Sequence, residues 1–330
     1  MSKILQSRDY FKPLTYPWAW DGFVMQEKMK WMPTEVPMHK DVQDWNQKLS
    51  AAEKNLLTQL FRFFTQGDLD VARGYYDKFI PAFRQPELRM MMGAFANMEG
   101  IHVWAYSLLL ETVGMPEVEY KAFTQYEAMA AKHEFVQQFD VKDTAGVARN
   151  LAVYSAFTEG LQLFSSFAIL MNFGRFNKMT GMNQIVAWSI RDESLHVEKM
   201  IELFRTLIEE NPQLWTDDFK LELYDICRKM VELEDAFIDL CFEQGGIEGL
   251  TAAEMKQFIR YIANRRLNQL GLKDNYDVKE NPLDWLDWIL NGKEHANFFE
   301  TRGTEYGEGV LTGSWSDLWT EIDNRNKEMA

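Results

Sequence analysis

Apolar residues recur along most of the chain with the period of an α-helix, and the segments with this pattern are long. Only 19 Gly and 9 Pro interrupt them. The sequences Ser50-Ala-Ala-Glu53 and Thr251-Ala-Ala-Glu254 are capping boxes, which begin helices. The pattern predicts helices over residues 51–80, 86–113, 116–139, 144–173, 182–210, 217–242 and 251–270. No segment shows the period of a strand, so we expect an all-α helical bundle.

The two ends of the chain lack this pattern. Residues 1–45 are rich in Pro and Trp, and we expect an extended N-terminal segment that packs on the outside of the bundle. Residues 301–330 contain four Gly and little periodicity, which predicts a flexible C-terminal tail. Residues 46–300 then form a single helical domain, although a length of 330 residues taken alone favours two domains.

Charge and composition narrow the classes of partner. Lys and Arg number 35 against 50 Asp and Glu, a net charge of −15. Such an acidic surface repels phosphate, which disfavours nucleic acid and anionic membranes as partners. The sequence has no signal-peptide pattern and no transmembrane run, so we expect a cytoplasmic protein. The two cysteines, Cys227 and Cys241, form no CxxC motif, which excludes a thiolate zinc site.

Four acidic residues interrupt strongly apolar stretches of the predicted helices. They are Asp68, Glu99, Glu159 and Glu193. Burying a carboxylate is costly unless it is paired or bound to a metal ion. Two of the five histidines, His102 and His196, each follow one of these acids by three residues and therefore project from the same helix face.

The spacing of the six residues repeats in two halves of the chain. Asp68 precedes Glu99 by 31 residues, and Glu159 precedes Glu193 by 34. Helical bundles that bind two metal ions use this inventory, one acid from each of two helices and Glu-x-x-His from each of two others. Four carboxylates also balance the charge of two divalent ions. Carboxylate and imidazole ligands favour iron or manganese. Each residue alone is equally well explained as a hydrogen-bonded core residue or an exposed charge.

Four stretches resemble the small, radical-generating subunit of class I ribonucleotide reductase, a member of the ferritin-like superfamily. They are FFTQGDLDVARGYYDKF around Asp68, NMEGIHVWAY around His102, SAFTEGLQLFSSFA around Glu159, and SIRDESLH at residues 189–196. The resemblance covers roughly residues 15–310. It implies that Asp68, Glu99 and His102 bind one metal ion, and that Glu159, Glu193 and His196 bind the other.

The same resemblance implies a path for a radical. Tyr106, four residues after His102, matches the tyrosine that is oxidised to a stable radical. Trp31 matches a tryptophan of the electron-transfer path, and Asp192 matches the acid that links this tryptophan to the histidine of the first metal. Tyr306 matches the tyrosine of the mobile tail that passes the radical to the large subunit. Ser189 is polar where the family often has an apolar residue near the radical.

The resemblance further implies the cofactor and partners. We expect two iron ions that react with dioxygen, with di-manganese as the alternative. We also expect a homodimer, and a large catalytic subunit that binds the tail near Trp315, Leu318 and Trp319. Ribonucleoside diphosphates would be reduced on that subunit. The rival hypotheses are a ferritin-like di-metal oxidase or oxygenase acting on a small molecule, an iron-storage protein, and a bundle without metal.

Overall fold

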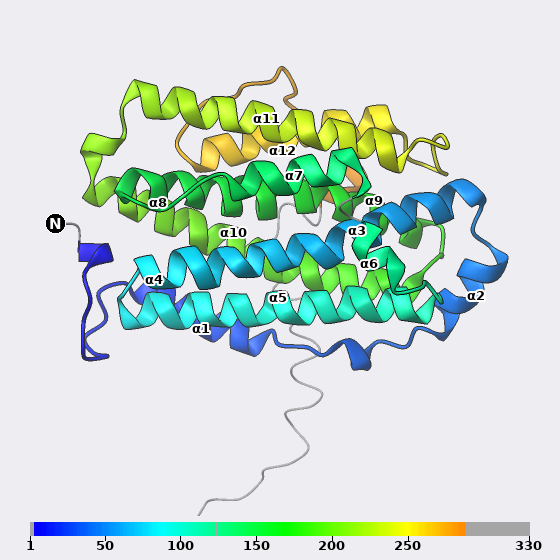
Figure 1. Cartoon of the computed structure of the whole chain (residues 1–330), viewed down its shortest axis with the longest axis horizontal. Coiled ribbons are helices and arrows are strands. Elements are labelled where there is room, and N and C mark those ends of the chain that lie inside the picture. The colour runs from blue at the N-terminus through cyan, green and yellow to red at the C-terminus, as the bar shows by residue number, and fades with distance from the viewer. Residues whose placement is uncertain (1–2, 123–124, 288–330) are drawn as a thin grey trace, which may run out of the picture. The chain divides into compact units, whose positions relative to one another are not determined.

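The computed structural model describes residues 3–122 and 125–287, and within it residues 3–284 belong to one compact unit. The long helices are α3 (Ala51–Arg73), α5 (Pro86–Thr112), α10 (Thr180–Glu210), α11 (Asp217–Cys241) and α12 (Ala252–Gln269). In Figure 1, α3 and α5 lie side by side, and α11 runs beside α12. The part of the chain that the structure describes contains no strand, only an isolated bridge between Ile247 and Leu250. The predicted all-α bundle is confirmed.

Both capping boxes form as predicted. The Ser50 hydroxyl accepts from the backbone N–H of Glu53, and the Glu53 carboxylate accepts from the backbone N–H of Ser50. Thr251 and Glu254 make the same reciprocal pair at the start of α12. These bonds satisfy N–H groups that have no partner within the helix, which explains why both helices begin where the sequence indicates.

Several predicted helices differ in their interior from a regular α-helix. The segment predicted at 51–80 changes into a π-helix, η3 (Gly74–Phe79), before α4 (Ile80–Ala82). The segment predicted at 144–173 consists of α8 (Thr144–Leu151), the π-helix η5 (Ala152–Leu163) and α9 (Phe164–Arg175). The segment predicted at 116–139 consists of α6 (Val118–Ala122) and α7 (Glu127–Gln137). Apolar periodicity does not distinguish a π-helix from an α-helix, because both bury one face.

The N-terminal segment is more helical than predicted. Residues 1–45 were expected to be extended, but they contain α1 (Pro17–Lys28) and most of α2 (His39–Gln47). The short 3₁₀ turns η1 (Lys3–Leu5) and η2 (Pro33–Glu35) lie before and between them, and η6 (Pro212–Leu214) and η7 (Asp284–Leu286) occur later. Pro17 occupies the first position of α1, where proline favours a helix. Helix α1 packs against α5 and α10.

The core of the described unit is formed by apolar side chains of α3, α5, η5, α9 and α10. Among the described residues, no helix is long and apolar enough to cross a membrane. The predicted tail at 301–330, with Tyr306, Trp315, Leu318 and Trp319, lies outside the described residues.

Candidate metal centre

Four helical segments bring the six predicted ligands into the interior of the bundle. Helix α3 supplies one acid, α5 supplies a Glu-x-x-His pair, η5 supplies one acid, and α10 supplies the second Glu-x-x-His pair. The six side chains are all buried, with at most 1% of each exposed: Asp68, Glu99, His102, Glu159, Glu193 and His196. Water therefore does not explain why these polar groups are tolerated in the core.

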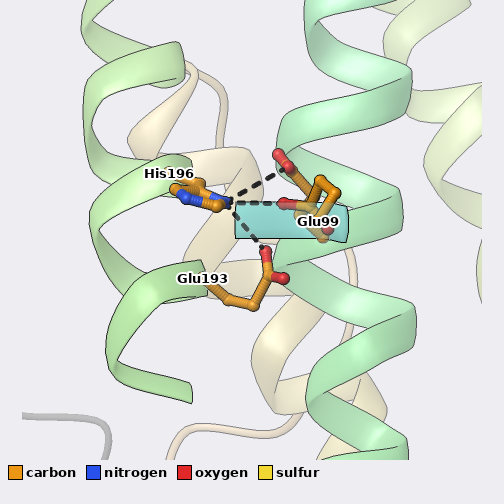
Figure 2. Close-up of side chains that lie close together, drawn as sticks. Glu99, Glu193 and His196 are labelled. Carbon is orange, nitrogen blue, oxygen red and sulfur yellow. Dashed lines mark ion pairs between the residues drawn. The ribbon is translucent and has the colours of Figure 1, made fainter. Parts of the chain in front are cut away.

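Glu99 and Glu193 lie between the two histidines. His196 Nδ1 is 3.0 Å from Glu99 Oε1 and 3.5 Å from Glu193 Oε2. His102 Nδ1 is 3.1 Å from Glu193 Oε1 and 3.6 Å from Glu99 Oε2. Figure 2 shows Glu99 on one helix and Glu193 and His196 on another, with their polar atoms directed toward one another. Each of these two carboxylates thus contacts both halves of the centre.

The polar atoms at this centre fit a metal ion better than they fit one another. One ligand atom from each of Glu99, Glu159, Glu193 and His196 lies within 4.8 Å of all the others. Both oxygens of Glu99 and of Glu193, Glu159 Oε2, Asp68 Oδ2 and His196 Nδ1 are buried and make no hydrogen bond of ordinary geometry, although some lie within ion-pair distance of an imidazole. Buried polar atoms are normally hydrogen-bonded, so this convergence of buried carboxylate and imidazole atoms indicates a cation site.

The pKa shifts of these side chains also indicate a cation site. Burial, followed by repulsion from neighbouring carboxylates, raises the pKa of Asp68 and of Glu159 well above the ordinary value. Burial alone would lower the pKa of His196, but Glu193 and Glu99 outweigh it and raise that pKa to about 10. The pKa of His102 is likewise well above the ordinary value, because Asp192, Glu193 and Glu99 outweigh burial. Four retained protons carry the same charge as two divalent ions, so protons and metal compete for this site.

The two histidines have different hydrogen-bond partners on their outer side. His102 Nε2 lies 3.2 Å from Asp192 Oδ2, and Trp31 Nε1 donates to the same oxygen at 2.7 Å. The Trp31 and His102 rings stack with centroids 6.0 Å apart. His196 Nε2 lies 3.0 Å from Gln26 Oε1, and Gln26 Nε2 donates to Asp192 Oδ1 at 3.3 Å. In both histidines Nε2 is engaged, which leaves Nδ1 facing the carboxylates.

Tyr106 is fully buried one turn after His102 on α5. Its ring stacks on Phe64 with centroids 4.3 Å apart, and Phe64 in turn stacks on Phe167. Its hydroxyl donates to Ser189 Oγ at 3.4 Å, a long hydrogen bond. Burial and the nearby Asp68 carboxylate raise the pKa of Tyr106 above its ordinary value, so the phenol stays protonated.

Two polar residues that lie at the centre were not predicted from the sequence. Tyr75, from η3, donates its hydroxyl to Glu159 Oε1 at 2.8 Å. Gln26, from α1, bridges Asp192 and His196. Tyr75 follows Asp68 by seven residues, so helical periodicity already placed both on one face. Nothing in the sequence around Gln26 distinguishes it from an exposed glutamine on an amphipathic helix.

Comparison with known proteins identifies the family. Residues 8–282 match the family model described as ribonucleotide reductase, small chain. The chain belongs to this family. A probable ribonucleoside-diphosphate reductase small subunit, 376L of Invertebrate iridescent virus 6, is 42% identical across 96% of this chain and 99% of its own length.

Solved structures show the same fold. The R2 subunit from Clostridium botulinum superimposes with a TM-score of 0.79 and 22% identity, over 86% of this chain and 90% of that one. The dimanganese(II) protein NrdF from Streptococcus sanguinis gives 0.75 and 22%, over 87% and 99%. The predicted family and ferritin-like fold are confirmed. This chain is thus the small chain of ribonucleotide reductase, an oxidoreductase in which a small chain works with a large chain.

Proposed function

We propose that this small chain generates and stores a tyrosyl radical on Tyr106 for a class I ribonucleoside-diphosphate reductase. The observation that carries the proposal is the buried cluster of four carboxylates and two histidines, one turn of α5 away from a buried phenol. Asp68, Glu99 and His102 would hold one metal ion, and Glu159, Glu193 and His196 the other. Glu99 and Glu193 each contact both histidines, so each would contribute to holding both ions.

The protein's own residues would prepare Tyr106 for one-electron oxidation. Two redox-active ions, with dioxygen as the oxidant, supply the oxidising capacity when bound. Phe64 covers one face of the phenol ring and is itself stacked on Phe167, and this apolar surface would keep water away from the radical. Since burial keeps the phenol protonated, its oxidation releases a proton as well as an electron, and the Ser189 hydroxyl is its hydrogen-bond partner.

The hydrogen-bonded chain from the centre to Trp31 supports a radical-transfer role. His102, Asp192 and Trp31 are joined by contacts of 3.2 and 2.7 Å, and all three are buried. We propose that this chain carries an electron from the large subunit to the Tyr106 radical, by way of Tyr306 in the tail at residues 301–330, so that the radical passes in the opposite direction to the large subunit. A di-metal oxidase acting on a small molecule would not need this chain, and the family match also disfavours that alternative.

The metal, the assembly and the location complete the proposal. The ligands suit iron, as does a tyrosine at position 106, and a related fold is that of a dimanganese(II) protein. We therefore propose a di-iron centre, with di-manganese as the alternative that metal analysis would distinguish. We also propose a homodimer in the cytoplasm, since closed two-fold symmetry is the commonest arrangement of soluble oligomers.

Electron paramagnetic resonance tests the assignment of Tyr106. The full-length protein loaded with Fe(II) and exposed to dioxygen is expected to show a tyrosyl signal, which Tyr106→Phe abolishes while both ions stay bound. Tyr154→Phe is the matched control, because Tyr154 is equally buried and its hydroxyl has no hydrogen-bond partner among the described residues. A tyrosyl signal that survives in Tyr106→Phe would refute the assignment.

A further inference from the structure

Glu159 is the predicted ligand with the least regular backbone. It lies in η5, where backbone hydrogen bonds follow the i→i+5 pattern of a π-helix. The other described π-helix, η3, supplies Tyr75, whose hydroxyl binds the Glu159 carboxylate. Tyr75 therefore fixes the carboxylate end of this residue. The position of its backbone must be fixed by something else.

A buried arginine of α12 contacts the backbone directly after Glu159. Arg266 is 5% exposed, and its Nε donates to the carbonyl oxygen of Gly160 at 2.7 Å. Its Nη1 donates to Gln269 Oε1 at 2.8 Å, and its guanidinium carbon lies 4.9 Å from the centre of the Phe164 ring. Phe164 is the residue at which the π-helix returns to the α-helix α9.

The return from π to α geometry explains why a carbonyl here gains from an outside donor. Where an i→i+5 pattern changes to i→i+4, two consecutive carbonyls face the same N–H group. A buried carbonyl needs a full partner, and Arg266 provides one for Gly160. Gly160 is also the residue that permits this approach, because a Cβ there would lie 2.6 Å from Arg266 Nε and 3.0 Å from the carbonyl oxygen of Ser155.

Burying the Arg266 guanidinium in this position costs desolvation free energy. Burial, together with the neighbouring Arg265, lowers the pKa of Arg266 to about 9. Its partners in the described chain are a carbonyl, an amide and an aromatic ring, none of which carries a negative charge. An apolar side chain of similar length would fill the same space without the cost of a desolvated charge. The position therefore calls for a function beyond packing.

We propose that Arg266 is a positioning residue that holds the π-helical turn at Gly160 and thereby places the Glu159 carboxylate for a metal ion. Tyr75 then holds the carboxylate from one side and Arg266 holds the backbone from the other. This inference rests on the proposed metal centre, because it assigns Glu159 to that centre. It concerns the backbone beneath the ligand, and so it makes a prediction for the metal-free protein as well.

The experiment compares Arg266→Met with Arg266→Lys in the full-length protein. Arg260→Met is the matched control, since Arg260 lies on the same helix and pairs with Asp235. Hydrogen–deuterium exchange of the metal-free proteins measures the stability of the π-helical turn, and calorimetric titration with Mn(II) measures the affinity of the centre.

In Arg266→Met we expect faster exchange over residues 155–166. We also expect the affinity for one of two Mn(II) ions to fall by about 10- to 100-fold, as for other residues that orient ligands. Arg266→Lys should lie between Arg266→Met and the wild type, because lysine keeps a donor without the planar fork.

Each outcome separates this inference from the proposed function. Wild-type protein that binds no Mn(II) would refute the proposed centre and this inference together. If the wild type binds two ions and exchange in Arg266→Met matches the control, the inference fails while the centre stands. Faster exchange with unchanged Mn(II) affinity would show that Arg266 only stabilises the fold, which also overturns the positioning role.

Discussion

The two halves of the centre use the same ligand types on different supports. In the first half, Asp68, Glu99 and His102 lie on the regular helices α3 and α5. In the second half, Glu159 lies on a π-helix, where Tyr75 donates to its carboxylate and Arg266 donates to the carbonyl oxygen of the next residue. Four residues after His102 stands the phenol of Tyr106, whereas four residues after His196 stands the buried thioether of Met200.

The outer partners of the histidines show what this difference means. His102 is backed by the carboxylate of Asp192, which raises the basicity of the imidazole and joins it to Trp31. His196 is backed by the neutral amide of Gln26, which fixes the ring without adding charge. The first half is therefore suited to the proposed transfer of an electron and a proton, whereas in the second half Tyr75 and Arg266 contact Glu159 and the residue after it. The two halves thus differ in residues that are not predicted ligands.

Removing a group that both halves share should have the largest effect. Glu193 contacts both histidines, and its pKa is lowered to about 2 because the two imidazoles outweigh the effect of burial. We expect Glu193→Gln to lower the affinity for both Mn(II) ions by at least about 100-fold. This is more than the roughly 10- to 100-fold loss typical of residues that only orient ligands. Calorimetric titration measures this. Glu198→Gln, on the exposed face of the same helix, is the control. If Glu193→Gln still binds one ion with wild-type affinity, the halves are independent.

Metal affinity should rise steeply with pH. Asp68, Glu159, His102 and His196 all have a raised pKa in the metal-free protein, so each tends to keep a proton that a metal ion must displace. Raising the pH removes this competition. Between pH 6.5 and 8 the affinity should gain about tenfold per pH unit for each proton displaced. Titration in buffers of different ionisation enthalpy counts the protons. A pH-independent affinity would mean that these four groups are already deprotonated.

Metal-free protein should show the opposite trend in stability. The pKa of His196 is about 10 in the folded chain against an ordinary value of 6.5. A group with a raised folded pKa stabilises the fold when protonated, and this contribution is lost as the pH rises through that window. The melting temperature of metal-free protein should therefore fall between pH 6.5 and 9 by several degrees more than that of the Mn(II)-loaded protein. Equal falls in the two samples would contradict it.

The sequence could single out the six candidate ligands, which the structure buries together in the core, because their evidence is local. An acid within an apolar run, or a histidine three residues after an acid, is visible in a window of one or two helical turns. The capping boxes at Ser50 and Thr251 are local in the same way. Gln26 and Arg266 depend on contacts with residues more than 100 positions away, at His196 and Gly160. Their side-chain types carry no sign of burial, and so only the folded structure reveals them.

The outer partners of the two histidines should differ in effect. Asp192→Asn removes the charge behind His102, and we expect metal affinity to fall by about 10- to 100-fold, with a larger loss of reductase turnover because the link to Trp31 is weakened. Gln26→Leu removes the partner of His196 and should cost about 10-fold in affinity. Mn(II) titration and turnover with the large subunit measure both. If Gln26→Leu reduces turnover as strongly as Asp192→Asn, the division of roles is wrong.

The smallest effect is expected at Ser189, whose hydroxyl is the hydrogen-bond partner of Tyr106. At 3.4 Å this bond is long, so Ser189→Ala should change the stability of the protein by no more than about 1 kcal/mol. Metal affinity should stay unchanged, because Ser189 contacts the phenol and not the predicted ligands. The tyrosyl signal should persist with a larger principal g value, as expected for a radical that has lost a hydrogen bond.

Ser166→Ala is the control, since that buried hydroxyl has no hydrogen-bond partner among the described residues. Complete loss of the signal in Ser189→Ala alone would mean that the hydroxyl takes part in releasing the proton of Tyr106. The first half would then depend on α10 for its radical as well as for the Glu193 carboxylate that contacts His102.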